Sequence, residues 1–462
     1  MKIDESNQPE AIAGNTGKSP ISRRGFMKTM GTITAAGAVI TAVEDTVYAA
    51  GAEGTLTVGA AKRIITPDPL LPVSGGMGPT HPTSSKQGDI TARAIFVKKG
   101  DTSLAIVALD LLGFPSVLGD RVRAKVSRIP GTNILIGSTH THSAPDCYAF
   151  PDGQGGHTGD LKYMDHVVNL AAGAINEAID KAVPAKLRAG TDVAKGKISY
   201  NYYAPDLCDH RMGVIQFQAV SGSTIATLIN YAIHPEVLGN DIGILSPDLI
   251  GPLNDAVEAS AGGLSLFMNS AQGGMVTADN RYLDRPKDAL RGYWEDERSW
   301  AECLRIGHTM ASEALRIIGK ADWQSDPTLY CRSTPVTIPI ESPDLWAVVT
   351  MSPLKYKHST DRKITVRVNL LNIGNCQIVT CPGEALPNIG SYVKRKMKGQ
   401  NNLFFGLTND AFGYILTRVD WNAFPRYEYC SRVCMGENTA EILIDKWLSL
   451  INTSPLPDGK KA

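Results

Sequence analysis

The chain has 462 residues, of which 43% are hydrophobic and 20% are charged. Such a composition is typical of a folded globular protein and excludes a chain that is disordered over most of its length. Lys plus Arg and Asp plus Glu both number 46, and no long basic run occurs. This balance excludes a strong electrostatic attraction to polyanions, so nucleic acid is not expected as a partner.

Residues 1–49 show the ordered features of a twin-arginine signal peptide. The pair Arg23-Arg24 precedes a mildly apolar stretch, which leads to small residues near Ala49. This stretch is shorter than the roughly 20 residues of a membrane-spanning helix, and it contains Gly and Thr. We therefore predict export by the twin-arginine translocase, with cleavage near Ala49, to a periplasmic or secreted location. The mature part, residues 50–462, has no segment that is predicted to span a membrane, and any membrane contact is expected to be peripheral.

The mature part mixes strand-like and helix-like segments along its whole length. Short runs rich in Ile, Val and Leu predict buried strands, and apolar residues at helical spacing predict amphipathic helices. In chain order, strands are expected at 93–97, 104–109, 133–138, 213–219, 225–232, 264–268, 364–371 and 376–381, and helices at 161–182, 298–318, 385–398 and 438–451. The pattern predicts a mixed α/β fold, a large single domain with central β-sheets flanked by helices, in which a two-lobed core has room to form.

The mature part contains eight cysteines, which an exported protein can pair in disulfides. One alternative is a four-thiolate zinc site formed by Cys376 and Cys381 with Cys430 and Cys434. The first two are five positions apart on a predicted strand, so their side chains point to opposite faces. We therefore favour buried thiols or a disulfide of undefined connectivity.

Two histidines stand at the end of a predicted strand. His140 and His142 follow an apolar run directly, and residues two positions apart share one face of a strand. The carboxyl ends of strands are where open α/β sheets bind ligands. The alternative is a pair of exposed loop histidines.

Two further residues repeat this placement. His234 ends another apolar run, and Glu384 follows the strand that leads into Pro382-Gly383. Taken alone, His234 also fits a hydrogen-bonded structural histidine, and Glu384 fits a carboxylate favoured by the start of a helix. The mature chain has no nucleophile-elbow or dinucleotide fingerprint. A metal site is thus the leading hypothesis, because imidazole and carboxylate ligands suit zinc and three protein ligands leave a position open for catalysis.

The same segments, in the same order, resemble the catalytic domain of the neutral/alkaline non-lysosomal ceramidase family. The residues that carry the resemblance lie at 87–97, 110–111, 139–143, 209–217, 246–248, 382–384 and 409–417. Each piece is short, but together they extend over most of the mature chain. The resemblance covers the catalytic domain without the immunoglobulin-like domain that follows it in the family.

The resemblance implies a zinc-dependent amidohydrolase that cleaves N-acylsphingosine to sphingosine and fatty acid by means of a metal-activated water. It implies Zn²⁺ ligands at His140, His234, Glu384 and Tyr414. It also implies that His142 and Tyr427 lie beside the metal, where they stabilise the oxygen that becomes charged or pass a proton to the leaving amine.

Two departures from the family pattern bear on the substrate. The family's serine-bearing segment corresponds to 273–278 here, which offers only the hydroxyl of Thr277, and Asn201-Tyr202-Tyr203 replaces a segment with a substrate-facing arginine. Three interpretations therefore remain open. The protein hydrolyses ceramide or a similar lipid amide, it hydrolyses a different ester or small amide, or it is a catalytically silent binding protein with the same fold.

Overall fold

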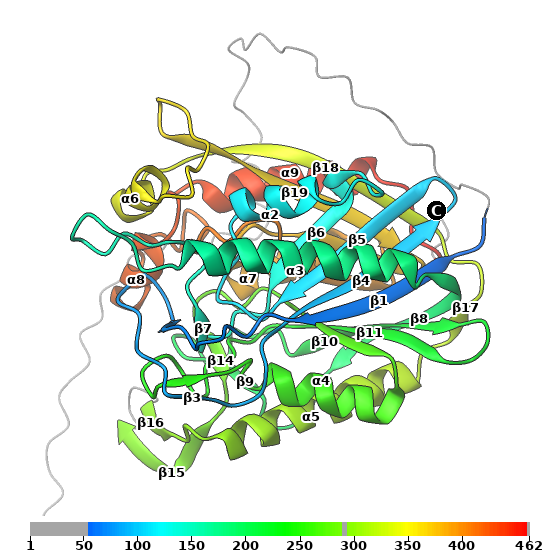
Figure 1. Cartoon of the computed structure of the whole chain (residues 1–462), viewed down its shortest axis with the longest axis horizontal. Helices are drawn as coiled ribbons and strands as arrows, with labels where there is room; N and C mark the ends of the chain where they lie inside the picture. The colour runs from blue at the N-terminus through cyan, green and yellow to red at the C-terminus, as the bar shows by residue number, and fades with distance from the viewer. Residues whose placement is uncertain (1–53, 289–292, 460–462) are drawn as a thin grey trace, which may run out of the picture. The chain divides into compact units, whose positions relative to one another are not determined.

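A nine-stranded and a four-stranded sheet form the framework of the computed structural model, which describes residues 54–288 and 293–459 (Figure 1). The predicted signal peptide therefore lies outside the described residues. All described residues belong to one unit of the chain. The mixed α/β fold, with large sheets flanked by helices, is as predicted.

The nine-stranded sheet has two sections that are joined by only two residue pairs between β1 and β8. The first section contains β1 (Thr57–Ile64), β4 (Thr91–Lys99), β5 (Thr102–Leu109) and β6 (Ile134–Ser138). The second contains β8 (Val183–Val193), β10 (Arg211–Ala219), β11 (Thr224–Tyr231), β13 (Leu264–Asn269) and β17 (Trp323–Gln324). The four-stranded sheet contains β18 (Leu329–Pro339), β19 (Lys363–Ile373), β20 (Cys376–Thr380) and β22 (Asn401–Phe405). Each of these three groups has one parallel pair, namely β5–β6, β11–β13 and β20–β22.

Short pairs and helices complete the described elements. The two-stranded pairs are β2 (Val73–Ser74) with β7 (Ala144–Pro145), β3 (Ser85–Lys86) with β12 (Ile244–Leu245), β9 (Ser199–Asn201) with β14 (Val276–Ala278), β15 (Arg281–Asp288) with β16 (Tyr293–Asp296), and β21 (Glu384–Ala385) with β23 (Tyr414–Ile415). The helices are α2 (Ser116–Ala124), α3 (Leu161–Asp180), α4 (Ile250–Ala261), α5 (Trp300–Gly319), α6 (Pro343–Met351), α7 (Pro387–Lys396), α8 (Glu428–Arg432) and α9 (Thr439–Thr453), with 3-10 turns η1 (Gly131–Asn133) and η2 (Pro425–Tyr427).

Strand periodicity divides the buried residues between two faces of each sheet. In β4, Phe96 packs in the cluster that contains α3, while the neighbouring Ile95 belongs to a central cluster. In β10, Phe217 lies in the same central cluster and Val214 faces α4 and α5. The four-stranded sheet also contributes to the central cluster. Because successive side chains point to opposite faces, one inner core joins all three groups of strands and each outer face is covered by helices.

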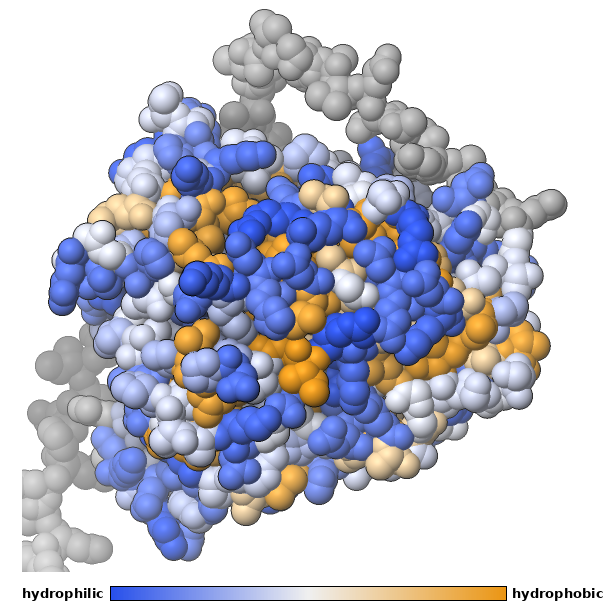
Figure 2. All heavy atoms as spheres, in the orientation of Figure 1, coloured by the Kyte–Doolittle hydropathy of each residue, from blue (hydrophilic) through white to orange (hydrophobic). Residues whose placement is uncertain are grey.

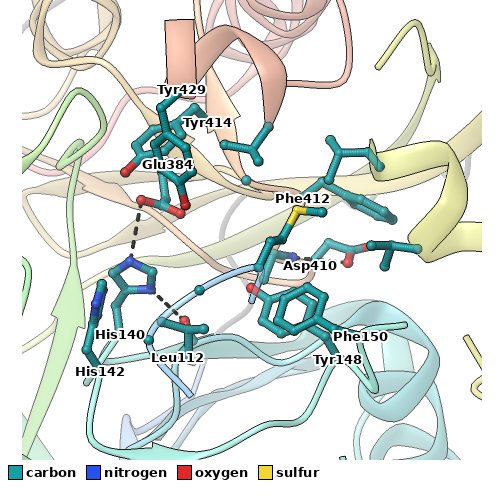
Figure 3. A pocket seen from close by; sticks show the side chains of 18 of the residues that line it. Leu112, His140, His142, Tyr148, Phe150, Glu384, Asp410, Phe412, Tyr414 and Tyr429 are labelled. Carbon is teal, nitrogen blue, oxygen red and sulfur yellow. Dashed lines mark hydrogen bonds and ion pairs between the residues drawn. The ribbon is translucent and has the colours of Figure 1, made fainter. Parts of the chain in front are cut away.

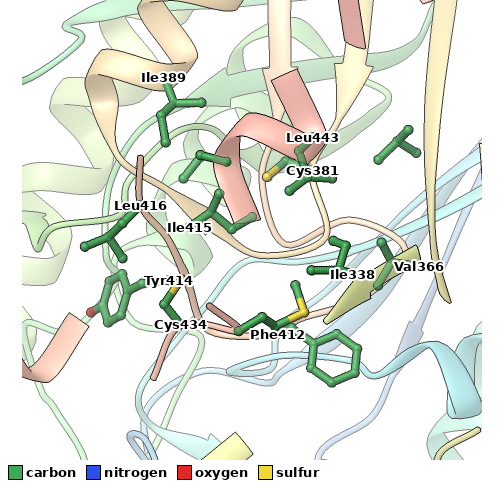
Figure 4. Packing of buried hydrophobic residues seen from close by; sticks show 14 of the residues in the cluster. Ile338, Val366, Cys381, Ile389, Phe412, Tyr414, Ile415, Leu416, Cys434 and Leu443 are labelled. Atoms are coloured by element: carbon green, nitrogen blue, oxygen red, sulfur yellow. The ribbon is translucent and has the colours of Figure 1, made fainter. Parts of the chain in front are cut away.

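The helices lie on the outer faces, where Figure 1 shows α3 across the first section and α4 with α5 along the second. Parts of α6, α7, α8 and α9 pack on the four-stranded sheet and form the largest cluster with it. Figure 4 shows some of the residues in this cluster. Trp447 of α9 is fully buried there, and its indole nitrogen donates a hydrogen bond to the carbonyl of Thr380, 2.9 Å away. This contact fixes the end of β20, from which a predicted site residue follows. The buried apolar residues of the described chain form four clusters.

The twelve elements expected from periodicity all occur, with ends shifted by a few residues. The clearest omissions are the eleven-residue strands β8 and β18. Both contain proline and many half-exposed polar residues, and β18 lies at the edge of its sheet, where proline is tolerated. Such strands lack the apolar run on which the prediction relied.

All eight cysteines are free thiols, and all except Cys208 are buried. Cys376 and Cys381 lie in different clusters on opposite sides of their sheet, as their odd spacing indicated.

Among the helices that the structure describes, none combines the length and apolar character needed to cross a bilayer. Hydrophilic residues cover much of the face seen in Figure 2, and hydrophobic residues appear at several places between them.

Candidate metal centre

Three strand ends deliver the predicted site residues to one place. His140 follows β6, His234 follows β11, and Glu384 follows β20, so each comes from a different group of strands. One carboxylate oxygen, Oε2 of Glu384, lies 3.1 Å from Nε2 of His234 and 3.4 Å from Nε2 of His140. All three residues are buried.

Backbone carbonyls orient the rings of His140 and His234. Nδ1 of His140 donates to the carbonyl of Leu112 at 2.6 Å, and Nδ1 of His234 donates to that of Val276 at 2.9 Å. A carbonyl only accepts hydrogen bonds, so both protons are on Nδ1 and both Nε2 lone pairs point toward Glu384. Carbonyl partners of this kind fix metal-binding histidines.

A carboxylate facing two imidazole lone pairs requires a positive charge between them. Burial raises the pKa of Glu384, but the charge and hydrogen bond of His140, followed by those of His234, outweigh it and hold the pKa below its ordinary value. The charge is either a second proton on an imidazole or a metal ion. Two nitrogens and one oxygen that converge in this way fit zinc.

His142 completes a cluster of three imidazoles, each of which brings one ring nitrogen within 4.8 Å of the others. Nδ1 of His142 lies 3.4 Å from Oε2 of Glu236, while Nε2 is buried without a hydrogen-bond partner among the described residues. Burial, and next the charges of His140 and His234, hold the pKa of His142 well below its ordinary value. His142 is therefore a neutral imidazole with a free nitrogen.

The side chain of Asn269 joins the two histidine segments. Its Nδ2 donates to the carbonyls of Thr139 and Ile233, at 3.1 and 2.7 Å, and its Oδ1 accepts from the amide nitrogens of Ile233 and Ser270. Thr139 and Ile233 immediately precede His140 and His234. A single fully buried amide at the end of β13 thus sets the spacing of the two rings.

Two glycines allow the segment of Glu384 to approach its neighbours. A Cβ on Gly273 would lie 2.1 Å from the carbonyl oxygen of Glu384, and one on Gly413 would lie 2.1 Å from that of Val433. Gly413 also has a φ of 55°, a left-handed conformation that glycine adopts readily. Any side chain at either position would displace the backbone next to the site.

A cavity with about 640 Å³ of space not filled by protein atoms, its open mouth included, opens beside this cluster. Figure 3 shows His140, His142, Glu384, Tyr414 and Tyr429 together at one part of its wall. Most of the remaining wall is apolar or aromatic. A mostly apolar wall with a few converging polar groups is typical of a small-molecule site.

The other predicted residues differ in how they relate to the cavity. Tyr414 lines it, but its hydroxyl donates to Sδ of Met275 at 2.9 Å, and burial, then the charge of Glu384, raise its pKa well above the ordinary value. Thr277 pairs with His234 through the backbone, yet it is not among the lining residues. Tyr427 does not line the cavity either. Its ring contacts that of Tyr203, with 6.1 Å between the ring centroids.

Sequence reasoning did not select four polar residues that line the cavity, namely Tyr148, Tyr356, Asp410 and Tyr429. Tyr429 lies two positions after Tyr427, so the motif match selects a tyrosine two residues away from the one that reaches the wall. Asp410 lies within the segment 409–417 that carries the family resemblance, but the resemblance gives it no role of its own. Tyr148 and Tyr356 lie in loops, and no motif or periodicity signals their position.

Comparisons with solved structures place this arrangement in a known fold. The neutral ceramidase from Pseudomonas aeruginosa superposes with a TM-score of 0.68 at 17% identity, over 89% of this chain and 76% of that one. The chain has a neutral ceramidase-like fold. A second structure, described as ceramidase complexed with C2, superposes on this fold with a TM-score of 0.66 at 16% identity, over 89% and 77% of the two chains. No family model and no curated protein matches the sequence.

Proposed function

We propose that the protein is a zinc-dependent hydrolase that cleaves an amide bond of ceramide or of a related N-acyl compound. The observation that carries the proposal is the convergence of His140, His234 and Glu384 beside an apolar cavity, whose wall contains His140 and Glu384, in a neutral ceramidase-like fold. Export by the twin-arginine route remains part of the proposal and rests on residues 1–49 alone.

His140, His234 and Glu384 would hold the zinc, with Tyr414 as the fourth ligand implied by the family resemblance. Tyr414 would have to leave Met275 and lose its proton, which its raised pKa opposes unless a cation is adjacent. The buried, unpartnered Nε2 of His142 is an alternative donor. When bound, zinc supplies Lewis-acid chemistry that activates a water near neutral pH and polarises the acyl carbonyl.

The chain's own residues account for the remaining steps. His142 is neutral and has a free Nε2, so it can accept a proton during attack and return it to the leaving amine. Tyr429 lines the cavity as a protonated phenol, because burial, followed by the negative charge of Glu384, raises its pKa to about 12. Such a phenol can donate a hydrogen bond to the oxygen that becomes charged. Tyr427, the residue implied by the motif, would support this wall from behind, and Thr277 would act through the backbone of His234.

The apolar wall suits an acyl chain or another lipid tail, which supports an amide substrate with a hydrophobic part. Ceramide remains one member of that class. The replacement at Tyr202 and Tyr203 favours weaker selectivity for long-chain ceramide than the family shows, because fixed positive charge is exchanged for aromatic hydroxyl surface.

The test is metal analysis together with turnover for the mature chain and three histidine variants. We expect one zinc per chain and hydrolysis of a fluorescent ceramide or of short N-acyl amines. His140→Ala and His234→Ala should each release most of the zinc and abolish turnover, whereas His166→Ala, on the exposed face of α3, should change neither. Zinc that survives both ligand changes would disprove the site. Bound zinc without turnover on any amide or ester would identify a silent binding protein instead.

A further inference from the structure

The apolar cavity ends on polar groups that the hydrolytic reaction does not use. Asp410 and Tyr356 line it together with His140 and His142, and Figure 3 shows Asp410 well apart from His140 and Glu384 in the view. Leu345, Val348 and several aromatic rings also belong to the wall of the cavity. We call Asp410 and Tyr356 the distal pair.

Asp410 uses only one of its two carboxyl oxygens. Oδ1 accepts hydrogen bonds from the amide nitrogens of Ser116 and Ala411, at 3.1 and 3.0 Å. Oδ2 is buried and has no hydrogen-bond partner in residues 54–288 and 293–459. The residue is 1% exposed, and its burial raises the pKa to about 7. The carboxyl group is thus held through Oδ1 by two backbone amides, the side chain of Ser116 also acts on it, and Oδ2 is left without a hydrogen bond.

Tyr356 offers a second unpaired group in the wall of the same cavity. It is 7% exposed, and its hydroxyl likewise has no hydrogen-bond partner within the described part of the chain. Its ring packs near Phe412, with 5.9 Å between centroids. Burial, and next the negative charge of Asp410, raise its pKa well above the ordinary value, so the phenol is a neutral donor and acceptor.

The distal pair lies within electrostatic reach of the reactive end. The pKa of Tyr148 is raised by burial first, then by the negative charge of Glu384 and by that of Asp410. The Tyr148 ring, stacked on Phe150 with 4.6 Å between centroids, therefore lies where both carboxyl groups act on it. Glu384, Tyr148 and Asp410 all line the one cavity that would hold the substrate.

Two unpaired polar atoms at the end of an apolar cavity are costly. Each buried group without a partner destabilises the folded protein, and native structures contain few of them. A methyl group placed against the distal pair would leave both unpaired. A hydroxyl or an ammonium group would donate to Oδ2 of Asp410 and exchange a hydrogen bond with Tyr356.

We propose that the distal pair recognises a hydrogen-bond donor at the far end of the substrate's apolar chain. The inference rests on the proposed hydrolase and narrows its substrates to amides whose chain ends in, or carries, a hydroxyl or amino group. Selection of this kind is strong, because an analogue without the donor leaves the buried groups unpaired, whereas one methylene more or less changes binding only modestly.

The test uses a series of fluorogenic N-acyl amides of increasing chain length, each with a methyl, hydroxyl or amino end, and a second series with the chain on the amine side. At one chain length we expect the hydroxyl or amino form to exceed the methyl form in kcat/KM by on the order of 10-fold to 100-fold. The comparison of the two donor-ended forms shows which donor is selected.

Variants assign the preference to the distal pair. Asp410→Leu should abolish it or invert it toward the methyl-ended substrate, and Tyr356→Phe, which removes one oxygen, should reduce it several-fold. Tyr163→Phe is the matched control, because Tyr163 is also a buried tyrosine with an unpartnered hydroxyl but does not line the cavity. If Asp410→Leu does not fold, Tyr356→Phe compared with Tyr163→Phe decides the question.

Binding measurements separate this inference from the proposed reaction. Calorimetry with the same compounds should show the same preference even if no amide is cleaved, in which case the hydrolase proposal fails and the distal pair stands. Equal binding of the three end groups at every length, or a preference that survives both Asp410→Leu and Tyr356→Phe, would overturn the inference and leave water as the partner of these groups.

Discussion

Asn269→Ala is expected to weaken zinc binding without removing any ligand. The amide of Asn269 makes four hydrogen bonds to the backbone around Thr139 and Ile233. Three of the four backbone atoms, the carbonyls of Thr139 and Ile233 and the nitrogen of Ile233, have no other hydrogen bond among the described residues. The substitution therefore frees the two segments that carry His140 and His234.

The magnitude follows from these three groups. At about 1–3 kcal/mol for each buried group left unpaired, the upper bound is about 9 kcal/mol. Water can enter the vacated space and satisfy some of them, so we expect a loss of unfolding free energy of about 3–5 kcal/mol. Residues that orient metal ligands typically change metal affinity by about 10–100-fold when they are replaced, and we expect a similar loss of zinc affinity.

Competition with a fluorescent zinc chelator measures the affinity, and chemical denaturation measures the stability. Asn372→Ala is the control, because Asn372 is a buried asparagine that bonds Gln377 and the carbonyl of Pro455 away from the cavity. It should lower stability and leave zinc affinity unchanged. Wild-type zinc affinity in Asn269→Ala would refute the argument that this amide sets the spacing of the two histidines.

Two further predictions concern export and pH. Replacing Arg23 and Arg24 with Lys together should leave the precursor in the cytoplasm, and normal processing of this variant on immunoblots of cell fractions would contradict the signal assignment. Burial raises the pKa of Asp410 to about 7, while hydrogen bonds from Ser116 lower it and the negative charge of Asp120 raises it further. The folded protein therefore keeps a proton on Asp410 that the unfolded chain releases near pH 4. The contribution of this proton to the free energy of unfolding is complete below about pH 4 and is lost as the pH rises through about 7. Asp410→Asn should remove this pH dependence of the free energy of unfolding. Denaturation curves of both proteins across this range test it, and parallel pH profiles would contradict the raised pKa.

The sequence alone determined the features that depend on local pattern. The apolar runs before His140 and His234 predicted strands with histidines at their ends, and β6 and β11 end as expected. The family resemblance, read from short ordered motifs, predicted the fold that the structural comparisons confirm. The apolar runs predict these strands because both faces of each strand are buried, so consecutive side chains are apolar.

Only the tertiary structure decided which residues meet. His234 and Glu384 are 150 positions apart, and their contact depends on three groups of strands sharing one inner core. For the same reason the cavity wall contains Tyr429 rather than Tyr427, and Asp410 reaches it from a loop without any periodic signal. Unpaired groups such as Oδ2 of Asp410 become visible only when every neighbour is known, because hydrogen-bond satisfaction is a property of the packed interior and not of the local sequence.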